Sequence, residues 1–246
     1  MTTLSRRRLV GAFATAGTLA FRGLPAFAQS TMDPATEAKL RTLLANPRRN
    51  PENAARDPYR HPLETLKFFG LRQDMKVLEV WPAGGWWTEF LRPLLQEKGY
   101  YGGSGFSTKE IPVRPDTMDL VLTFRNIHNW MGDNSVRYMF DTMYASLKPG
   151  GYLGVEEHRA PANVPQDPRA VSGYVREDYA ISLIELSGFK FLAKSEINAN
   201  PKDTKDYPQG VWTLPPSYVE GAKDRDKYAA IGESDRFTLL FQKPLS

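Results

Sequence analysis

The 246-residue sequence contains no cysteine. Disulfides, iron–sulfur clusters and cysteine-ligated zinc are therefore excluded as sources of stability or chemistry. Histidine is scarce too, so any imidazole chemistry depends on His61, His128 and His158. Because 41% of the residues are hydrophobic and 24% are charged, the composition is that of an ordinary globular protein of one good-sized domain.

An excess of one charge is lacking over most of the chain. The formal net charge is +4, but residues 1–28 hold four arginines and no acidic residue. The rest of the chain then has 32 − 4 = 28 basic and 28 acidic residues, which balance. A balanced charge without a basic helix argues against a nucleic-acid partner. We expect a small-molecule ligand, and the sequence leaves the oligomeric state open.

A long apolar run is also lacking. The stretch 9–21 falls short of the roughly 20 residues that a membrane span requires, and Arg22 follows it. Paired arginines precede this stretch in SRRRLV (5–10), and a small-x-small ending, Ala-Phe-Ala, closes it at 26–28. These features predict a twin-arginine signal peptide over residues 1–28, export to the periplasm, and no stable membrane insertion after cleavage.

Residues 29–70 are predicted to form an N-terminal arm. Helices are expected at 33–45 and 63–69. Four prolines interrupt the segment 46–62 between them, which is therefore predicted to be extended on the surface. Four side chains of this segment either form ion pairs that hold it down or line a pocket: Arg56, Asp57, Tyr59 and Arg60.

Residues 71–246 are predicted to form one α/β domain. Strands are expected at 75–81, 100–106, 119–124, 152–157, 189–196 and 236–242, and helices at 88–97, 133–147 and 177–186. This alternation is typical of a doubly wound, mainly parallel sheet. Ligands of such sheets bind beyond the carboxyl ends of the strands, which selects residues 79–87, 125–130 and 156–159.

The motifs in these three places carry a family resemblance. EVWPAGG (79–85), DLVLTFRNIHNW (119–130) and LKPGGYLGVEEHR (147–159) resemble class I S-adenosylmethionine-dependent methyltransferases. RDPYRHPLETLKFFGL, WPAGGWWTE and GESDRFTLLFQKP are similar to a bacterial group of mostly exported, methyltransferase-like proteins. The resemblance covers nearly all of residues 45–246 and implies a Rossmann-like fold with S-adenosylmethionine as cofactor.

The resemblance also implies which residues hold the cofactor. Gly84 and Gly85 let the backbone approach the methionine end, whose carboxylate can meet amide groups at a helix start. Glu79 either accepts from the cofactor's ammonium group or caps the next helix, and Trp86 and Trp87 either shield the ligand or pack in the core. The predicted cofactor-binding residues are Glu79, Trp81, Ala83, Gly84, Gly85, Trp86 and Asn126.

One part of the expected site is reduced. The second strand, YYGGSGF, ends without the acid that the family uses to hold the ribose, and Glu110 and Asp116 are the acids nearby. The interval from Glu79 to Asp119 accommodates one strand and one helix but no covered third strand. The sequence therefore predicts a shortened fold, which counts against full cofactor affinity.

The histidines supply the candidate catalytic groups. Glu156 and His158 share one face of a strand by the two-residue period, whereas Glu157 faces away. We expect His128 and His158 to point into one cleft, with His61 folded over it by the arm. Near neutral pH an imidazole suits a general base. The predicted catalytic residues are thus His128, His158, Glu156 and His61. No metal site is predicted, although these side chains also allow hydrogen-bonding roles or a zinc site.

Three functions remain open at this level. The leading one is a methyltransferase acting on a small or envelope-associated acceptor. The second is a non-catalytic periplasmic binding protein on a degenerate methyltransferase fold. The third is a metal-dependent hydrolase that uses the His/Glu cluster.

Overall fold

The computed structural model describes residues 32–104 and 114–245. The predicted signal peptide and Glu110 lie outside these residues. Among the helices formed by the described residues, none is long and apolar enough to cross a membrane.

The described strands form one six-stranded sheet in the order β2-β1-β3-β4-β6-β5. Neighbouring strands from β2 to β4 run parallel, whereas β6 is antiparallel to both β4 and β5. The strands are β1 (Lys76–Val80), β2 (Tyr100–Gly103), β3 (Met118–Phe124), β4 (Leu147–His158), β5 (Lys190–Ser195) and β6 (Arg236–Gln242).

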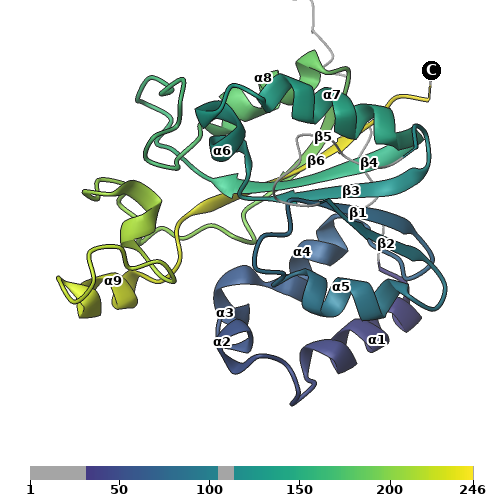
Figure 1. Ribbon diagram of the computed structural model, residues 1–246, viewed down its shortest axis with the longest axis horizontal. Coiled ribbons are helices and arrows are strands. Elements are labelled where there is room, and N and C mark those ends of the chain that lie inside the picture. Colours follow the sequence, from purple (N-terminus) through teal and green to yellow (C-terminus); the bar gives the residue numbers. More distant parts are fainter. Residues whose placement is uncertain (1–31, 105–113, 246) are drawn as a thin grey trace, which may run out of the picture.

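Helices cover both faces of this sheet (Figure 1). One face carries α1 (Pro34–Leu44), α2 (Pro51–Ala54), α3 (Asp57–Arg60), α4 (Pro62–Phe68) and α5 (Thr88–Leu95). The other carries α6 (Ile127–Gly132), α7 (Val136–Ser146) and α8 (Glu177–Leu186). A 3-10 turn (Gly210–Thr213) and α9 (Arg225–Ile231) lie in the loops beyond one end of the sheet.

The alternation of side chains along β1 explains the two layers. Leu78 and Val80 enter the core under α6–α8, whereas Val77 enters the core under α1, α4 and α5. Glu79 shares the face of Val77, because side chains two residues apart point to the same side of a strand. A carboxylate is thereby carried into the interior at the carboxyl end of β1.

The proline-rich segment 46–62 is not extended, so that expectation was wrong. It folds into α2 and α3, each four residues long and each with proline in its first turn. Proline is tolerated there because the missing amide hydrogen would have no partner in the helix. The Asn50 side chain accepts from the Glu52 amide and caps α2.

Other elements follow the predicted order with local differences. The helix α6 was not predicted from the sequence, and β4 begins at Leu147, before its predicted start. At the other edge, β2 is terminal in the described part of the sheet, in agreement with the predicted shortening. Asp116 precedes β3 and pairs with Lys243 at 2.7 Å, so it lies away from the carboxyl ends of the strands.

Candidate functional site

The turn after β1 has an unusual backbone. Trp81, Ala83 and Gly85 all adopt left-handed conformations, with φ of 54°, 48° and 72°. Only glycine adopts this region without a steric penalty, which for other residues is about 1–2 kcal/mol. Strained residues persist where the surrounding structure enforces them, often at functional sites. The turn thus has the shape of a glycine loop, although two of its three left-handed residues carry side chains.

A cavity of about 320 Å³ opens beside this turn, at the carboxyl ends of β1, β3 and β4. Gly84, His128 and His158 all line it, each from a different motif. The convergence predicted from the parallel strand ends is therefore present in the structure. Trp212 and Ser217 line it from the loops before α9.

A second, more open cavity of about 450 Å³ lies on the other side of the turn. Thr88, Tyr101 and Ser104 line it, and it shares Ala83 and Gly84 with the first cavity. A Cβ atom added to Gly84 would meet no atom within 4 Å. Gly84 therefore borders open space on a ridge between two hollows, as expected for a backbone segment that a ligand approaches.

Glu79 is buried between the two cavities, with 1% of its surface exposed. Its Oε2 accepts from the Tyr101 hydroxyl at 2.7 Å and from the Thr88 hydroxyl at 3.1 Å. Burial raises the pKa of Glu79 to about 7 and outweighs the opposing effect of these two hydrogen bonds. The carboxyl group is consequently poised between its two protonation states near neutral pH.

The tryptophans of the turn combine packing with a place in the cavity wall. Trp87 stacks on Phe124 with ring centroids 4.0 Å apart, and Trp86 meets Trp87 edge-on at 4.8 Å. The Trp86 indole donates to the Asn53 carbonyl at 2.8 Å. Trp81 packs edge-on against Trp130 at 5.9 Å. Three of these indoles, those of Trp81, Trp86 and Trp87, also line the first cavity.

Asn126, the N-cap residue of α6 just after β3, holds the turn in place. Its side-chain amide donates to the Val80 carbonyl at 2.9 Å and to the Thr123 hydroxyl at 3.1 Å. The residue also lines the first cavity. A predicted cofactor contact therefore has a structural role in fixing the end of β1.

His128 and His158 lie together, with ring centroids 5.3 Å apart, but their acidic partner is Glu157. Glu157 Oε1 lies 3.0 Å from His128 Nδ1 and accepts from the His158 amide at 2.8 Å. The expectation that Glu157 faces away was therefore wrong. His158 is the last residue of β4, so its ring reaches the cavity from the strand end, 2.5 Å from Ser234 Oγ at Nδ1.

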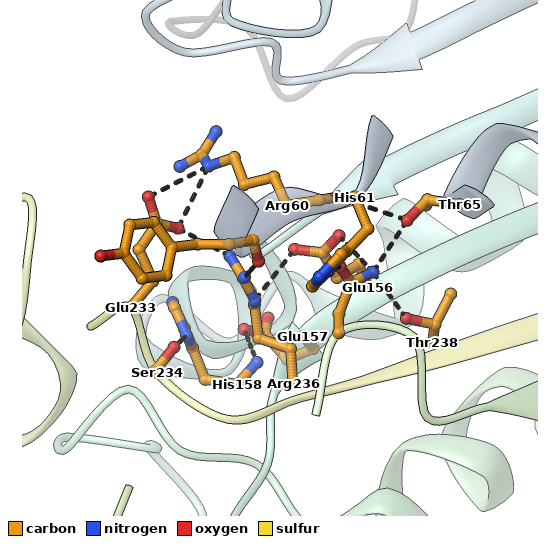
Figure 2. Close-up of polar contacts among 12 residues, drawn as sticks. Arg60, His61, Thr65, Glu156, Glu157, His158, Glu233, Ser234, Arg236 and Thr238 are labelled. Atoms are coloured by element: carbon orange, nitrogen blue, oxygen red, sulfur yellow. Dashed lines mark hydrogen bonds and ion pairs between the residues drawn. The ribbon is translucent and has the colours of Figure 1, made fainter. Parts of the chain in front are cut away.

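Glu156 and His61 belong to a separate polar cluster outside the lining of the first cavity. The Asn198 amide donates to Glu156 at 3.2 Å, and Asn198 Oδ1 lies 3.4 Å from His61 Nδ1 (Figure 2). Thr65 and Thr238 complete this cluster. The structure thus does not bring these two predicted catalytic residues to the cavity.

The pKa of His158 reflects its surroundings. Burial, and then the nearby charges of His128 and Arg125, lower the pKa of His158 well below its usual range. Potential ligand atoms of His128, Glu157 and His158 lie within 4.8 Å of one another. Two imidazoles and a carboxylate suit zinc or another divalent transition metal.

An arginine cluster beside the histidines was not anticipated as a unit. Glu233 sits at its centre and pairs with Arg60 at 3.1 Å and with Arg236 at 2.8 Å (Figure 2). It also pairs with Arg56 at 2.6 Å. Arg56 and Arg60 form these ion pairs and also line the first cavity. For these two side chains, both predicted roles, ion pairing and pocket lining, are therefore present. Asp57 instead pairs with Arg49 at 2.5 Å. The sequence signal is weak, because Glu233 follows Arg60 by 173 residues.

Comparisons with solved structures agree with this architecture. The chain is similar to a SAM-dependent methyltransferase from Aquifex aeolicus (16% identity, TM-score 0.52, 84% of this chain and 98% of that one covered). It is also similar to the [4+2]-cyclase SpnF (15% identity, TM-score 0.50, 86% and 93% covered). No protein-family model matches the sequence, and no curated protein does. The chain has the Rossmann-like fold of class I methyltransferases.

Proposed function

We propose that the protein is an S-adenosylmethionine-dependent methyltransferase that acts on a small or envelope-associated acceptor. The observation that carries this proposal is the glycine turn, whose open residue Gly84 separates two cavities at the strand ends. The fold alone does not establish chemistry, since SpnF is described as a cyclase.

The residues of the turn fit the cofactor in part. Gly84 and Gly85 would hold its amino-acid end, Glu79 would accept from its ammonium group, and Thr88 and Tyr101 border the room for a nucleoside. The end of β2 is Gly103-Ser104, without an acid for the ribose. When bound, the cofactor supplies an activated methyl group.

The acceptor proton has a candidate base in His128. Its Nδ1 lies 3.0 Å from Glu157, which can orient the ring and stabilise a protonated imidazole. A hydrogen bond from Nδ1 to that carboxylate leaves Nε2 as the proton acceptor. Trp212 packs edge-on against the ring, with the ring centroids 5.8 Å apart.

Cofactor binding is the first test, because it requires no knowledge of the acceptor. Isothermal titration with S-adenosylmethionine and with the demethylated product should give saturable binding to protein purified from the cytoplasm. Gly84→Val should abolish binding, since the new side chain enters the open space of the turn. Gly132→Ala is the control: its Cβ meets the Arg169 carbonyl at an ordinary 3.7 Å, away from both cavities. Absence of heat and of any melting shift with the wild type would contradict the proposal.

A non-catalytic binding protein is the second candidate. Trp81 and Ala83 place side chains in a turn whose backbone is that of a glycine loop, and β2 ends without a carboxylate. This candidate requires an unchanged melting temperature with either form of the cofactor. A shift of several degrees would eliminate it.

A metal-dependent hydrolase is the third candidate, supported by the proximity of His128, Glu157 and His158. Metal analysis of gently purified protein, together with the variant His158→Asn, tests it. Stoichiometric zinc that the variant loses would support this candidate, whereas metal-free wild type would remove it.

We propose that the signal-like N-terminus directs export through the twin-arginine pathway, which carries folded proteins. Replacing Arg6 and Arg7 by lysine should retain the precursor in the cytoplasm. Equal periplasmic recovery of both forms would contradict this part of the proposal.

A further inference from the structure

The first cavity has an excess of positive charge in its lining. Arg56, Arg60 and Arg125 line it together with two acids, Glu79 and Glu233. The count is 3 − 2 = +1 even if Glu79 is ionised. Two further carboxylates near the cavity do not line it and already have partners: Glu156 accepts from Asn198, and Glu157 contacts His128. The lining of this cavity therefore favours a ligand group that carries a negative charge.

The single carboxylate of Glu233 cannot neutralise all of the arginines around it. Three guanidinium groups already bind its two oxygens, and their charges, with that of Arg125, hold the pKa of Glu233 well below its usual range although burial opposes them. Arg60 uses its Nε for this contact, while its Nη1 and Nη2 are buried without a hydrogen-bond acceptor. Its guanidinium instead lies over the Trp86 ring, 4.7 Å from the centroid.

Arg125 has no such partner. Among residues 32–104 and 114–245, no hydrogen bond or ion pair satisfies its guanidinium, and its Nε is buried. Its backbone is left-handed, with φ of 59°, at the end of β3. An unpaired cation in a partly buried site is unfavourable unless a ligand compensates it. Glu233 and Glu156 act on Arg125 through space, but neither carboxylate is bonded to it. Backbone strain and the lack of a bonded carboxylate therefore coincide at one residue that lines the cavity.

We propose that Arg125, supported by the charges of Arg60 and Arg56, binds an acidic group of the ligand, a carboxylate or a phosphate. A guanidinium presents a planar pair of donors that matches two oxygens of such a group. Identifying this ligand as the methyl acceptor rests on the proposed function, whereas the anion site itself does not. The site lies in the same cavity as His128 and Gly84, so an anchored acceptor would lie between the base and the turn.

Anion binding is measured with inorganic phosphate and with acetate, at constant ionic strength set by chloride. Either probe should raise the melting temperature of the wild type saturably, by about 3–5 °C at ten times its Kd. Arg125→Gln should weaken that binding about ten- to a hundredfold. It should fold, because Arg125 loses no partner. Arg125→Lys should retain part of the phosphate affinity through its charge, and the exposed Arg137→Gln serves as the matched control.

The same variants are titrated with S-adenosylmethionine. Unchanged cofactor affinity in Arg125→Gln with lost anion affinity supports the assignment to the acceptor. Lost cofactor affinity would place Arg125 at the cofactor carboxylate and overturn that assignment. No saturable effect of either anion on the wild type, or an equal loss in Arg137→Gln, would overturn the anion site. A wild type that binds anions through Arg125 but no cofactor would retain the site and refute the methyltransferase function.

Discussion

Replacing Glu79 by glutamine tests the buried carboxyl group at the centre of the site. The folded pKa of Glu79 is about 7, compared with its ordinary 4.5. The difference, 7 − 4.5, is roughly 2.5 pH units and corresponds to about 3 kcal/mol at 1.36 kcal/mol per unit. This value is an upper estimate, because local relaxation and water entry reduce the cost of burying a charge.

The direction follows from proton binding in the two states. Below pH 4.5 the carboxyl is protonated whether the chain is folded or not, so it causes no penalty. As pH rises from about 4.5 to 7, the unfolded chain loses the proton before the folded chain does, and stability falls. Above pH 7 the full penalty is present. Glutamine resembles the protonated acid and does not titrate.

We therefore expect Glu79→Gln to change stability little at pH 5 and to be more stable than the wild type by about 1–3 kcal/mol at pH 8. Urea unfolding at four pH values between 5 and 8 measures this, and other titrating groups cancel in the difference between the two proteins. The same substitution at Glu64, on the exposed surface of α4, is the control for replacing a carboxylate outside the core. A stability difference for Glu79→Gln that does not change with pH would refute the reasoning.

Three further predictions concern single residues. Gly84→Ala should leave the free energy of unfolding within about 0.5 kcal/mol of wild type, whereas Gly85→Ala should cost about 1–2 kcal/mol because its φ is 72°; urea titrations of both compare them, and equal losses would contradict the open space at Gly84. Gly154→Ala should destabilise by about 1–3 kcal/mol, since its Cβ would lie within 2.8 Å of two core side chains, and an unchanged melting curve would disprove that close packing. Glu233→Gln should lower the free energy of unfolding by about 3–5 kcal/mol, because three arginines lose the carboxylate that they share. Thermal unfolding measures this, and an unchanged stability would contradict it.

The layered architecture can be predicted from the amino-acid sequence. Largely apolar runs such as 119–124 predict strands buried on both faces, and glycines or prolines mark where the helices stop. Parallel connections then bring the strand ends to one edge of the sheet, which is why Gly84, His128 and His158 could be predicted to share one hollow. The shortened interval after Glu79 likewise limited the number of strands through chain length alone.

The local sequence pattern did not predict the short helices or the side-chain contacts at the end of β4. The Asn50 side chain caps α2, and ion pairs of Asp57 and Arg60 hold α3, whereas four-residue helices carry no periodic signal. At the end of β4 the two-residue period predicted Glu156 as the partner of His158. Tertiary contacts instead tie Glu156 to Asn198 and leave Glu157 between the two histidines.

The charge of the cavity depends on contacts that exist only in the folded chain. Glu233 meets Arg56 and Arg60, which lie far from it in sequence, and the partnerless Arg125 becomes recognisable only when every neighbouring carboxylate has been placed. Sequence patterns report periodicity and local preference, whereas ion pairing depends on distances between segments that folding brings together. The chain therefore encodes its sheet locally, and it encodes the selectivity of its site through long-range packing.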